Sequence, residues 1–467
     1  MQSRYGLIPD VLSEIFWMCI PDEAVDLEDF GSPTQSPYNV ACVCRLWRRV
    51  ALSSPRLWAK INLSVTKRYR DGGAGRDFSL RSLETTLLRA SSSPLSLQMF
   101  SNNHNGDILP RLLNMAEDVQ TRCERISLMV EGPSSKRIIT DSDIRLYDLP
   151  LLKYLKLCLR NKSQLVDIDL SNAYQLQTLD ILMTDRLYLF SDGSPLRNLT
   201  RIQFDLKSDS AIGVTLCMTL LQISPSLEYF QAEVFDPDFS EEELSYPVLR
   251  LERLHTLQLY YHTYASNIRH ILDHLQTPQL RILATGIRDG ELDNTNDFST
   301  NVPLFLQGSS FVDSLEELNL ATVILPEIYS SIQLSSNITK LGLSGIWPDT
   351  KEETHALISL LNLYHCPQHQ SGIYTCVYNS DDIEHRDCLS GLICPQLEEI
   401  SFDFCDLGGC FNSLVDMILS RWYPPPGIQR ALKVVNVKYS HVSGLEDAAE
   451  LASCVREGLK LSILELD

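Results

Sequence analysis

The stretch RLHTLQLYY, residues 253–261, shows a pattern that recurs along most of this chain of 467 residues. Leu254, Leu257 and Leu259 form an apolar triplet with two residues in its first gap and one residue in its second. The alternation of Leu257 and Leu259 with polar neighbours is typical of a strand that buries one face. The repetition of this triplet predicts the fold class.

Copies of the triplet begin at Leu152, Leu176, Leu199, Leu227, Leu254, Leu280, Leu315, Ile338, Leu397 and Leu432. A degenerate copy lies at Ile126 and Leu128, and most neighbouring copies start 23 to 28 residues apart. This spacing is the period of leucine-rich repeats. Helix-like stretches such as 211–223 and 268–275 lie between copies, so each repeat is expected to contain one strand and one helix. An ordinary α/β domain with leucine-rich strands is the alternative.

Proline stands just before five of the triplets, as Pro150, Pro195, Pro225, Pro278 and Pro395. Because proline cannot continue a helix, we expect it to end the preceding segment and to direct the chain into the strand. The predicted fold class is therefore α/β. Residues 1–62 form a small helical domain, 63–94 a linker and capping helix, and 95–467 a curved leucine-rich-repeat solenoid with a parallel sheet on its concave side.

The composition favours a folded protein with an acidic surface. Apolar residues make up 44% of the chain, and its formal net charge is -20. Such a surface repels phosphate backbones, so nucleic acid is not an expected partner. We find no run of 18 apolar residues and no signal-peptide pattern. The 13 scattered cysteines then indicate free thiols in a reducing compartment, which predicts an intracellular, cytoplasmic or nuclear protein that does not bind membranes.

The interval between Ile338 and Leu397 is the longest in the series and is rich in possible metal ligands. They are His365, Cys366, His369, Cys376, His385, Cys388 and Cys394. Their spacing matches no standard zinc finger, and the interval has no Cys-x-x-Cys pair. We therefore expect no metal and no cofactor. A zinc-dependent enzyme in this interval is the alternative.

The common catalytic motifs are missing from the sequence. It has no phosphate-binding Gly-Lys-Ser/Thr loop, no Gly-x-Ser-x-Gly elbow and no Gly-x-Gly-x-x-Gly after a strand. The carboxylates are numerous but spread along the chain. The sequence therefore predicts a protein that is not an enzyme and has no catalytic residues.

The N-terminal stretch LIPDVLSEIF, residues 7–16, predicts a helix with an apolar stripe, because proline and an acidic residue suit its first turn. A polar, acidic segment follows. Apolar residues then recur at helical spacing from Val40 to Ala51, and Pro55 opens a short segment that ends at Trp58. On pattern alone, these helices could simply cap a larger domain.

The order of residues in this region resembles the F-box, most closely that of F-box proteins from mushroom-forming fungi. The resemblance covers roughly residues 7–58 and includes the ending Ser-x-Pro-Arg-Leu-Trp at 53–58. Two features depart from the family pattern, namely Ile8 beside Leu7 and the long acidic loop between the two halves. The resemblance implies docking on a Skp-family adaptor, which connects an F-box protein to a cullin–RING ubiquitin ligase. The matching positions are Leu7, Pro9, Val11, Leu12, Ile15, Phe16, Val43, Cys44, Trp47, Val50, Leu57 and Trp58.

The residues between the apolar positions of each strand are expected to line the concave face of the repeats. Tyrosine is enriched in interface hot spots because it combines apolar area with a hydrogen-bonding tip. We therefore expect an unknown target protein to bind at Tyr154, Arg201, Tyr229, Glu233, Gln258 and Tyr260. The predicted function is substrate recognition for a Skp–cullin–F-box ubiquitin ligase. The alternative is a non-enzymatic repeat scaffold that the N-terminal helices merely cap.

Overall fold

The computed structural model describes most of the chain. The described residues are 8–20, 25–26, 30, 32–65, 74–102, 119–131, 144–159, 165–182, 186–205, 212–234, 246–261, 265–287, 300–309, 311–321, 325–345, 351–363, 393–407, 409–425, 427–440, 442, 444–445 and 448–464. Two compact units are present. Unit 1 comprises residues 1–211 with 219–227, and unit 2 comprises residues 212–218 with 228–467.

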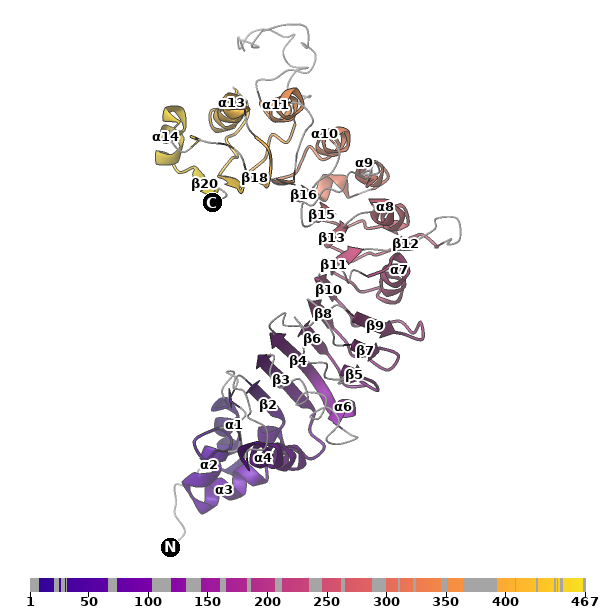
Figure 1. Ribbon diagram of the computed structural model, residues 1–467, viewed down its shortest axis with the longest axis vertical. Coiled ribbons are helices and arrows are strands. Elements are labelled where there is room, and N and C mark those ends of the chain that lie inside the picture. Colours follow the sequence, from indigo (N-terminus) through magenta and orange to yellow (C-terminus); the bar gives the residue numbers. More distant parts are fainter. Residues whose placement is uncertain are drawn as a thin grey trace. The chain divides into compact units, whose positions relative to one another are not determined.

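Unit 1 contains a run of parallel strands that begins beside the N-terminal helices (Figure 1). The helices are α1 (Pro9–Met18), α2 (Tyr38–Val43), α3 (Arg45–Leu52), the 3-10 helix η1 (Pro55–Trp58), α4 (Ala74–Ala90) and α6 (Val119–Arg122). The strand order is β1 (Val25–Asp26), β2 (Lys60–Val65), β3 (Leu95–Asn102), β4 (Cys123–Glu131), β6 (Tyr154–Leu159), β8 (Thr178–Leu182) and β10 (Arg201–Asp205). The predicted domain boundary after residue 62 falls inside β2, which pairs in parallel with β3.

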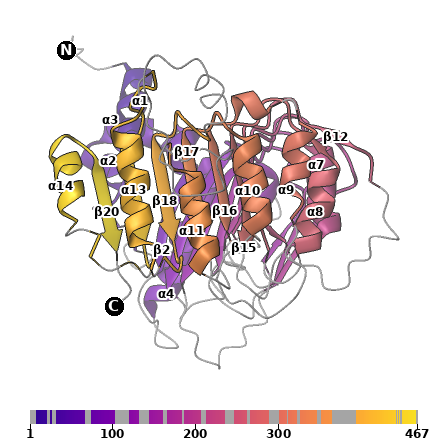
Figure 2. The same cartoon turned by 90° about the horizontal axis from the view of Figure 1, so that it is seen from above.

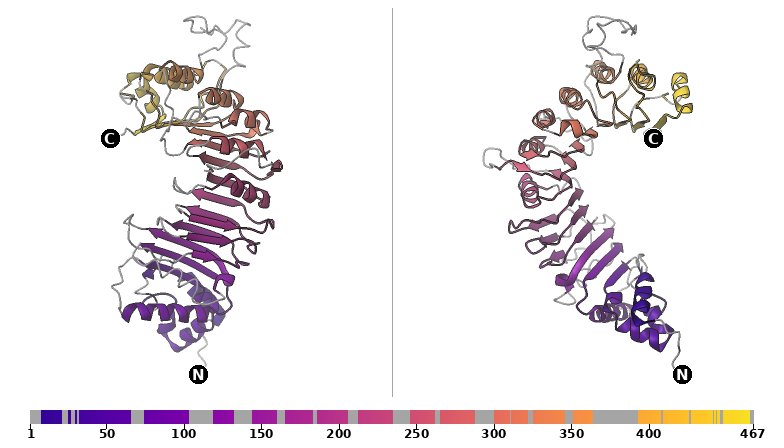
Figure 3. Two further views of the ribbon diagram at one scale, coloured as in Figure 1. Left: turned by 45° about the vertical axis from the view of Figure 1, so that its right-hand side comes forward. Right: turned by 180° about the vertical axis from the view of Figure 1, so that it is seen from behind.

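Behind the strands of unit 1 lies a second sheet of three short parallel strands (Figures 1 and 3). They are β5 (Ile144–Leu146), β7 (Leu165–Asp169) and β9 (Arg186–Phe190). Each of these strands lies in the chain between two strands of the main run. The expectation of one helix per repeat is therefore wrong for this part of unit 1, where the return segment is an extended strand with buried residues such as Val166 and Ile168.

Unit 2 follows the predicted strand-and-helix alternation more closely. The strand order is β11 (Tyr229–Val234), β13 (Thr256–Tyr261), β15 (Ile282–Ile287), β16 (Glu317–Ala321), β17 (Lys340–Ser344), β18 (Glu399–Asp403), β19 (Val434–Lys438) and β20 (Lys460–Leu464). One face of these strands is covered by helices (Figure 2). They are α8 (Ala265–Asp273), α9 (Val302–Gln307), α10 (Leu325–Leu334), α11 (Lys351–Leu360), α13 (Phe411–Trp422) and α14 (Ala449–Arg456). Unit 2 also contains the short helix η2 (Val312–Ser314) and the parallel pair β12 (Leu249–Arg250) and β14 (Leu275–Gln276). Helix α7 (Val214–Ile223) contributes residues to both units.

The apolar triplets point into the core as the sequence predicts. In β13, Leu257 and Leu259 are fully buried, whereas Thr256, Gln258 and Tyr260 are half-buried on the other face. Neighbouring strands pair in register, so that Leu257 lies beside Leu283 and Leu283 lies beside Leu318. The chain is thus mixed α/β with a large parallel sheet. The curvature predicted for the repeats remains a prediction.

The recurring prolines have a more specific role than helix termination. The backbone N–H of the first triplet residue donates to the carbonyl oxygen three residues earlier, for example from Leu227 to Ser224 at 3.2 Å and from Leu280 to Thr277 at 3.2 Å. Pro225 and Pro278 occupy the second position of these turns, where the fixed φ of proline is already correct. Pro195 differs, because the corresponding turn begins one residue later, at Leu196.

The structure corrects a second sequence expectation, a continuous helix from Val40 to Ala51. The chain instead forms α2 and α3, separated by Cys44 in an extended conformation with φ -158° and ψ 171°. The Cys44 thiol accepts a hydrogen bond from the backbone N–H of Trp47 at 3.4 Å and so acts as the N-terminal cap of α3. None of the helices among the described residues is both long and apolar enough to cross a membrane.

Candidate interaction surfaces

Helix α1 has two apolar sides. It begins at Pro9, whose missing N–H costs nothing in the first turn, and Asp10 lies near the positive end of the helix dipole. Leu12 and Phe16 point into the helical module and are 1% exposed. This inner side is the part of α1 that stabilises the module.

The other apolar side of α1 is open to solvent. Ile8, Val11, Ile15 and Met18 follow one another at spacings of three, four and three residues, so they lie on one stripe of the helix surface. Val11 is 44% exposed and Ile15 is 39% exposed, while Ile8 and Met18 are more exposed still. Val43, the last residue of α2, is also exposed. We call these five residues the N-terminal apolar stripe.

The inner side packs against α3 and η1. The ring of Phe16 contacts that of Trp47 with centroids 4.9 Å apart. Trp58 is fully buried, and its indole N–H donates to the carbonyl oxygen of Ala51 at 2.9 Å. At the edge of the module, Arg56 lies 3.2 Å from the Glu14 carboxylate and 4.3 Å above the ring of Trp17.

The module is joined to the first strands of unit 1 through helix α4. The guanidinium of Arg89 lies 4.4 Å above the ring of Trp58, and the hydroxyl of Tyr38 donates to the backbone oxygen of Ser82 at 3.1 Å. The same hydroxyl is within hydrogen-bonding distance of Thr86. One side of the module therefore packs on the repeat region, and the apolar stripe lies on a side that remains accessible.

The predicted adaptor-binding residues fall into three groups by exposure. The exposed group comprises Pro9, Val11, Ile15, Val43 and Cys44. Trp47 is half-buried. The buried group comprises Leu12, Phe16, Val50, Leu57 and Trp58. Leu7 lies outside the described residues. The buried group holds the module together, and only the exposed group can contact another protein directly. Sequence reasoning named Ile8 only as a departure from the family pattern and did not select Met18.

Two of the predicted target-binding residues lie on the strands of unit 1. Tyr154 is half-buried beneath the guanidinium of Arg125, which lies 4.1 Å from its ring. Arg201 lies 3.3 Å from the Asp180 carboxylate and also donates to the side chain of Gln203. Burial raises the pKa of Asp180, whereas Arg201 and Lys156 counteract this shift. These side chains form one polar layer across β4 to β10.

The other four predicted target-binding residues lie in unit 2. The hydroxyl of Tyr229 donates to the side-chain oxygen of Gln231 and reaches that of Gln258 at 3.5 Å. Tyr260 is half-buried beside Glu233 in the register of β11 and β13. Glu233 is 1% exposed, so it does not offer a carboxylate to solvent. The accessible surface here consists of Tyr229, Gln258 and Tyr260.

Sequence reasoning missed a pair of exposed aromatic residues that follow two neighbouring strands of unit 2. Phe404 and Tyr439 stack with centroids 4.9 Å apart and planes at 21°. Both residues have left-handed backbone conformations, with φ of 53° and 50°, at the position that Gly345 occupies after β17. The signal in the sequence is an aromatic residue directly after the strand pattern, where glycine is the easier choice.

The described residues offer no reactive or metal-binding cluster. No group of three His, Cys, Asp or Glu side chains among them could hold a metal ion. Burial raises the pKa of Cys123 to about 12 and that of Cys394 to about 12, so both thiols stay protonated near neutral pH. His365, Cys366, His369, Cys376, His385 and Cys388, from the predicted ligand-rich interval, lie outside the described residues.

A search with models of protein families finds none that matches this chain, and a comparison with curated proteins finds none that is similar to it. Support for a function therefore comes from the geometry of the N-terminal module and of the strand faces.

Proposed function

We propose that this protein is the substrate-recognition subunit of a Skp–cullin–F-box ubiquitin ligase in the cytoplasm or nucleus. The N-terminal module docks on a Skp-family adaptor, and the strand faces of the repeats capture a target protein. The chain supplies proximity, and an associated enzyme transfers ubiquitin. The proposal rests on the F-box-like residue order together with one observation, the N-terminal apolar stripe.

The stripe supports docking because it is apolar and open to solvent, and four of its five residues follow one side of α1 and its N-terminal cap. An amphipathic helix normally turns its apolar side to the core and its polar side to water. Helix α1 does bury Leu12 and Phe16, yet it also exposes Ile8, Val11, Ile15 and Met18. A partner with an apolar groove would remove this second stripe from water and gain about 25 cal/mol for each Å² that it buries.

The alternative is a repeat scaffold capped by the N-terminal helices. The packing of Trp58 beneath Arg89 of α4 favours a capping role for the inner side of the module. Capping does not explain the apolar stripe, because the cap contacts are made by other residues. The two roles use different sides of the same module, so they can be separated by mutation.

The test is co-purification of the protein with a Skp-family adaptor from the same organism. We expect the wild type to bind and the double variant Val11→Asp/Ile15→Asp to lose binding, because each carboxylate would have to be desolvated at an apolar contact. Both side chains are exposed, so the variant should unfold at the same denaturant concentration as the wild type. Leu12→Asp is unsuitable because it would place a charge in the core of the module.

Leu88→Asp is the matched control, since Leu88 is an exposed leucine on α4, away from the stripe. It should bind the adaptor as well as the wild type does. Absence of wild-type binding, or equal binding by the double variant, would leave the capped scaffold as the better account.

A further inference from the structure

Strand β20 forms the last position in the strand order of unit 2, and no described strand pairs with its outer edge. The backbone N–H of Lys460 donates to Lys433, and the carbonyl oxygen of Leu464 accepts from Tyr439. In a parallel sheet, alternate residues of a strand bond to opposite neighbours. Lys460, Ser462 and Leu464 therefore bond towards β19, and the N–H and C=O groups of Leu461 and Ile463 point outward.

The side chains at this edge leave the core of unit 2 incompletely covered. Leu461 and Ile463 lie beside Val435 and Val437 in the register of β19 and β20. The two valines are fully buried, but Leu461 and Ile463 are only half-buried. Leu464 of β20 and Val455 of α14 are 47% and 45% exposed. An unpaired strand edge with half-exposed apolar side chains is a template for pairing with another strand.

We propose that β20 pairs in an antiparallel arrangement with β20 of a second copy of this chain, joining the two sheets about a two-fold axis at Ser462. In this register Leu461 of one copy faces Ile463 of the other, and the two residues exchange both backbone hydrogen bonds through their outward N–H and C=O groups. Their side chains lie on the same face, so four apolar residues continue the core across the axis. The contact is isologous, and it closes after two copies.

The charges at the edge suit this arrangement. The only charged side chain among residues 460–464 is Lys460, which faces Leu464 of the second copy and not another lysine. Ser462 faces Ser462 of the second copy across the axis. A parallel pairing would instead bring the two Lys460 ammonium groups side by side, which is unfavourable.

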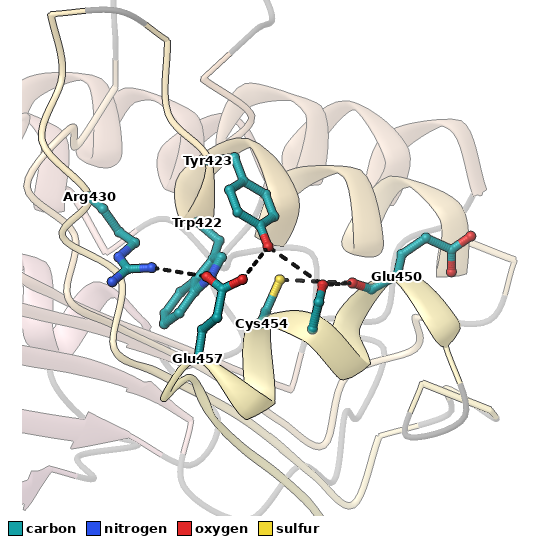
Figure 4. Close-up of polar contacts among 7 residues, drawn as sticks. Trp422, Tyr423, Arg430, Glu450, Cys454 and Glu457 are labelled. Carbon is teal, nitrogen blue, oxygen red and sulfur yellow. Dashed lines mark hydrogen bonds and ion pairs between the residues drawn. The ribbon is translucent and has the colours of Figure 1, made fainter.

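Helix α14 lies beside β20 and supplies a second complementary surface. Its exposed Glu450 is in the first turn and its exposed Arg456 in the last, so antiparallel copies of the helix would place opposite charges together. The helix is firmly held on α13. Glu457 accepts from the indole N–H of Trp422 and the hydroxyl of Tyr423, both at 3.1 Å, and lies 3.4 Å from Arg430 (Figure 4). A fixed helix can form such a contact without first being ordered.

Sedimentation velocity of the full chain over a range of concentrations tests the pairing. The wild type should be a dimer, and Ile463→Asp should be a monomer at concentrations at least about tenfold above the wild-type dissociation constant, because it places a charge inside the joined core. Ser462→Asp is not a neutral control, since two carboxylates would meet on the axis. Leu88→Asp, on α4 in unit 1, is the control and should remain dimeric.

A disulfide experiment fixes the register and does not depend on how stable the Ile463→Asp variant is. Residues that face each other in a non-hydrogen-bonded antiparallel pair have Cα atoms about 4.5 Å apart, within the range of a disulfide. Ser462→Cys should therefore form a covalent dimer on mild oxidation and release it on reduction. Lys460→Cys should give no more covalent dimer than the wild type, because the two introduced thiols lie on opposite sides of the axis.

The inference is independent of adaptor binding, since residues 460–464 and the N-terminal apolar stripe belong to different units. A wild type that stays monomeric at all concentrations would overturn it. A dimer that persists in folded Ile463→Asp, or one that Ser462→Cys does not cross-link, would also overturn it, because the interface would then lie elsewhere on the chain.

Discussion

At the scale of single residues, exposure separates positions that look equivalent in the sequence. Val11 and Leu12 are neighbouring apolar residues of one helix, yet Val11 is exposed and Leu12 is buried. The helical period of 3.6 residues turns adjacent side chains by about 100°, so Leu12 faces the inside of the module and Val11 faces solvent. The same logic separates Ile15 from Phe16, which is why the exposed apolar side of α1 can be altered without removing the core of the module.

Asp403, the last residue of β18, carries a prediction about pH. Burial raises the pKa of its carboxyl group, Lys438 counteracts the shift, and the buried Oδ1 atom has no hydrogen-bond partner among the described residues. A raised folded-state pKa means that the folded protein binds the proton more tightly than the unfolded chain. The contribution of Asp403 to stability is therefore fully present below the unfolded pKa and is lost as pH rises through the folded pKa.

Asp403→Asn should consequently unfold at a higher denaturant concentration than the wild type near pH 7, and this advantage should shrink towards pH 3. Urea unfolding at several pH values measures both effects. Asp406→Asn, a nearby carboxylate outside the strand, serves as the control for a change in net charge. An advantage that is independent of pH would show that the ionisation of Asp403 is not its cause.

At the scale of elements, the sequence pattern does not reveal where each proline lies relative to the turn before its strand. Pro278 occupies the second position of the turn that closes between Thr277 and Leu280, whereas Pro195 precedes its turn. Proline at a compatible position stabilises a protein by about 0.4–1 kcal/mol, chiefly because it restricts the unfolded chain. Elements of similar sequence therefore differ in what their prolines contribute.

Pro278→Ala should lower the free energy of unfolding by about 0.4–1 kcal/mol, because the turn loses its fixed φ while the hydrogen bond from Leu280 remains. Pro195→Ala, which lies outside its turn, should cost less. Chemical denaturation of both variants provides the comparison. Equal losses would mean that the proline acts through general chain stiffness and that its place in the turn is unimportant.

At the scale of the whole molecule, the N-terminal helices and the first strands of unit 1 share one core. Trp58 connects them, since it is fully buried, donates to Ala51 of α3 and lies beneath Arg89 of α4. The predicted boundary between a helical domain and a linker, at residue 62, lies within β2 (Lys60–Val65). Strand β2 directly follows η1 and pairs with β3.

Trp58→Ala should therefore cost about 3–5 kcal/mol, the usual loss for a buried tryptophan, and should weaken α3 and β2 together. Hydrogen exchange of the backbone amides measures this, with faster exchange expected in both elements. Trp17→Ala, a half-buried tryptophan at the edge of the same module, is the control and should cost less. Faster exchange confined to the helices would indicate that the module folds independently of the strands.

The sequence by itself determined the mixed α/β class, the parallel pairing of the repeats and the inward direction of the apolar triplets. These follow from a short pattern that recurs mostly every 23 to 28 residues, because each strand needs only its neighbour to bury its leucines. It also located the N-terminal helices, although it joined α2 and α3 across Cys44, whose capping thiol has no strong sequence signature.

Only the tertiary structure decided which apolar residues remain exposed to solvent and which elements pack behind the strands. The short sheet of β5, β7 and β9 replaces helices because extended segments of neighbouring repeats hydrogen-bond to one another, a contact that no single repeat encodes. Likewise, Leu461 and Val435 are both apolar strand residues in the same register, and only their place in the sheet makes one half-exposed and the other buried. Burial depends on neighbours that are distant in the chain, so local pattern cannot supply it.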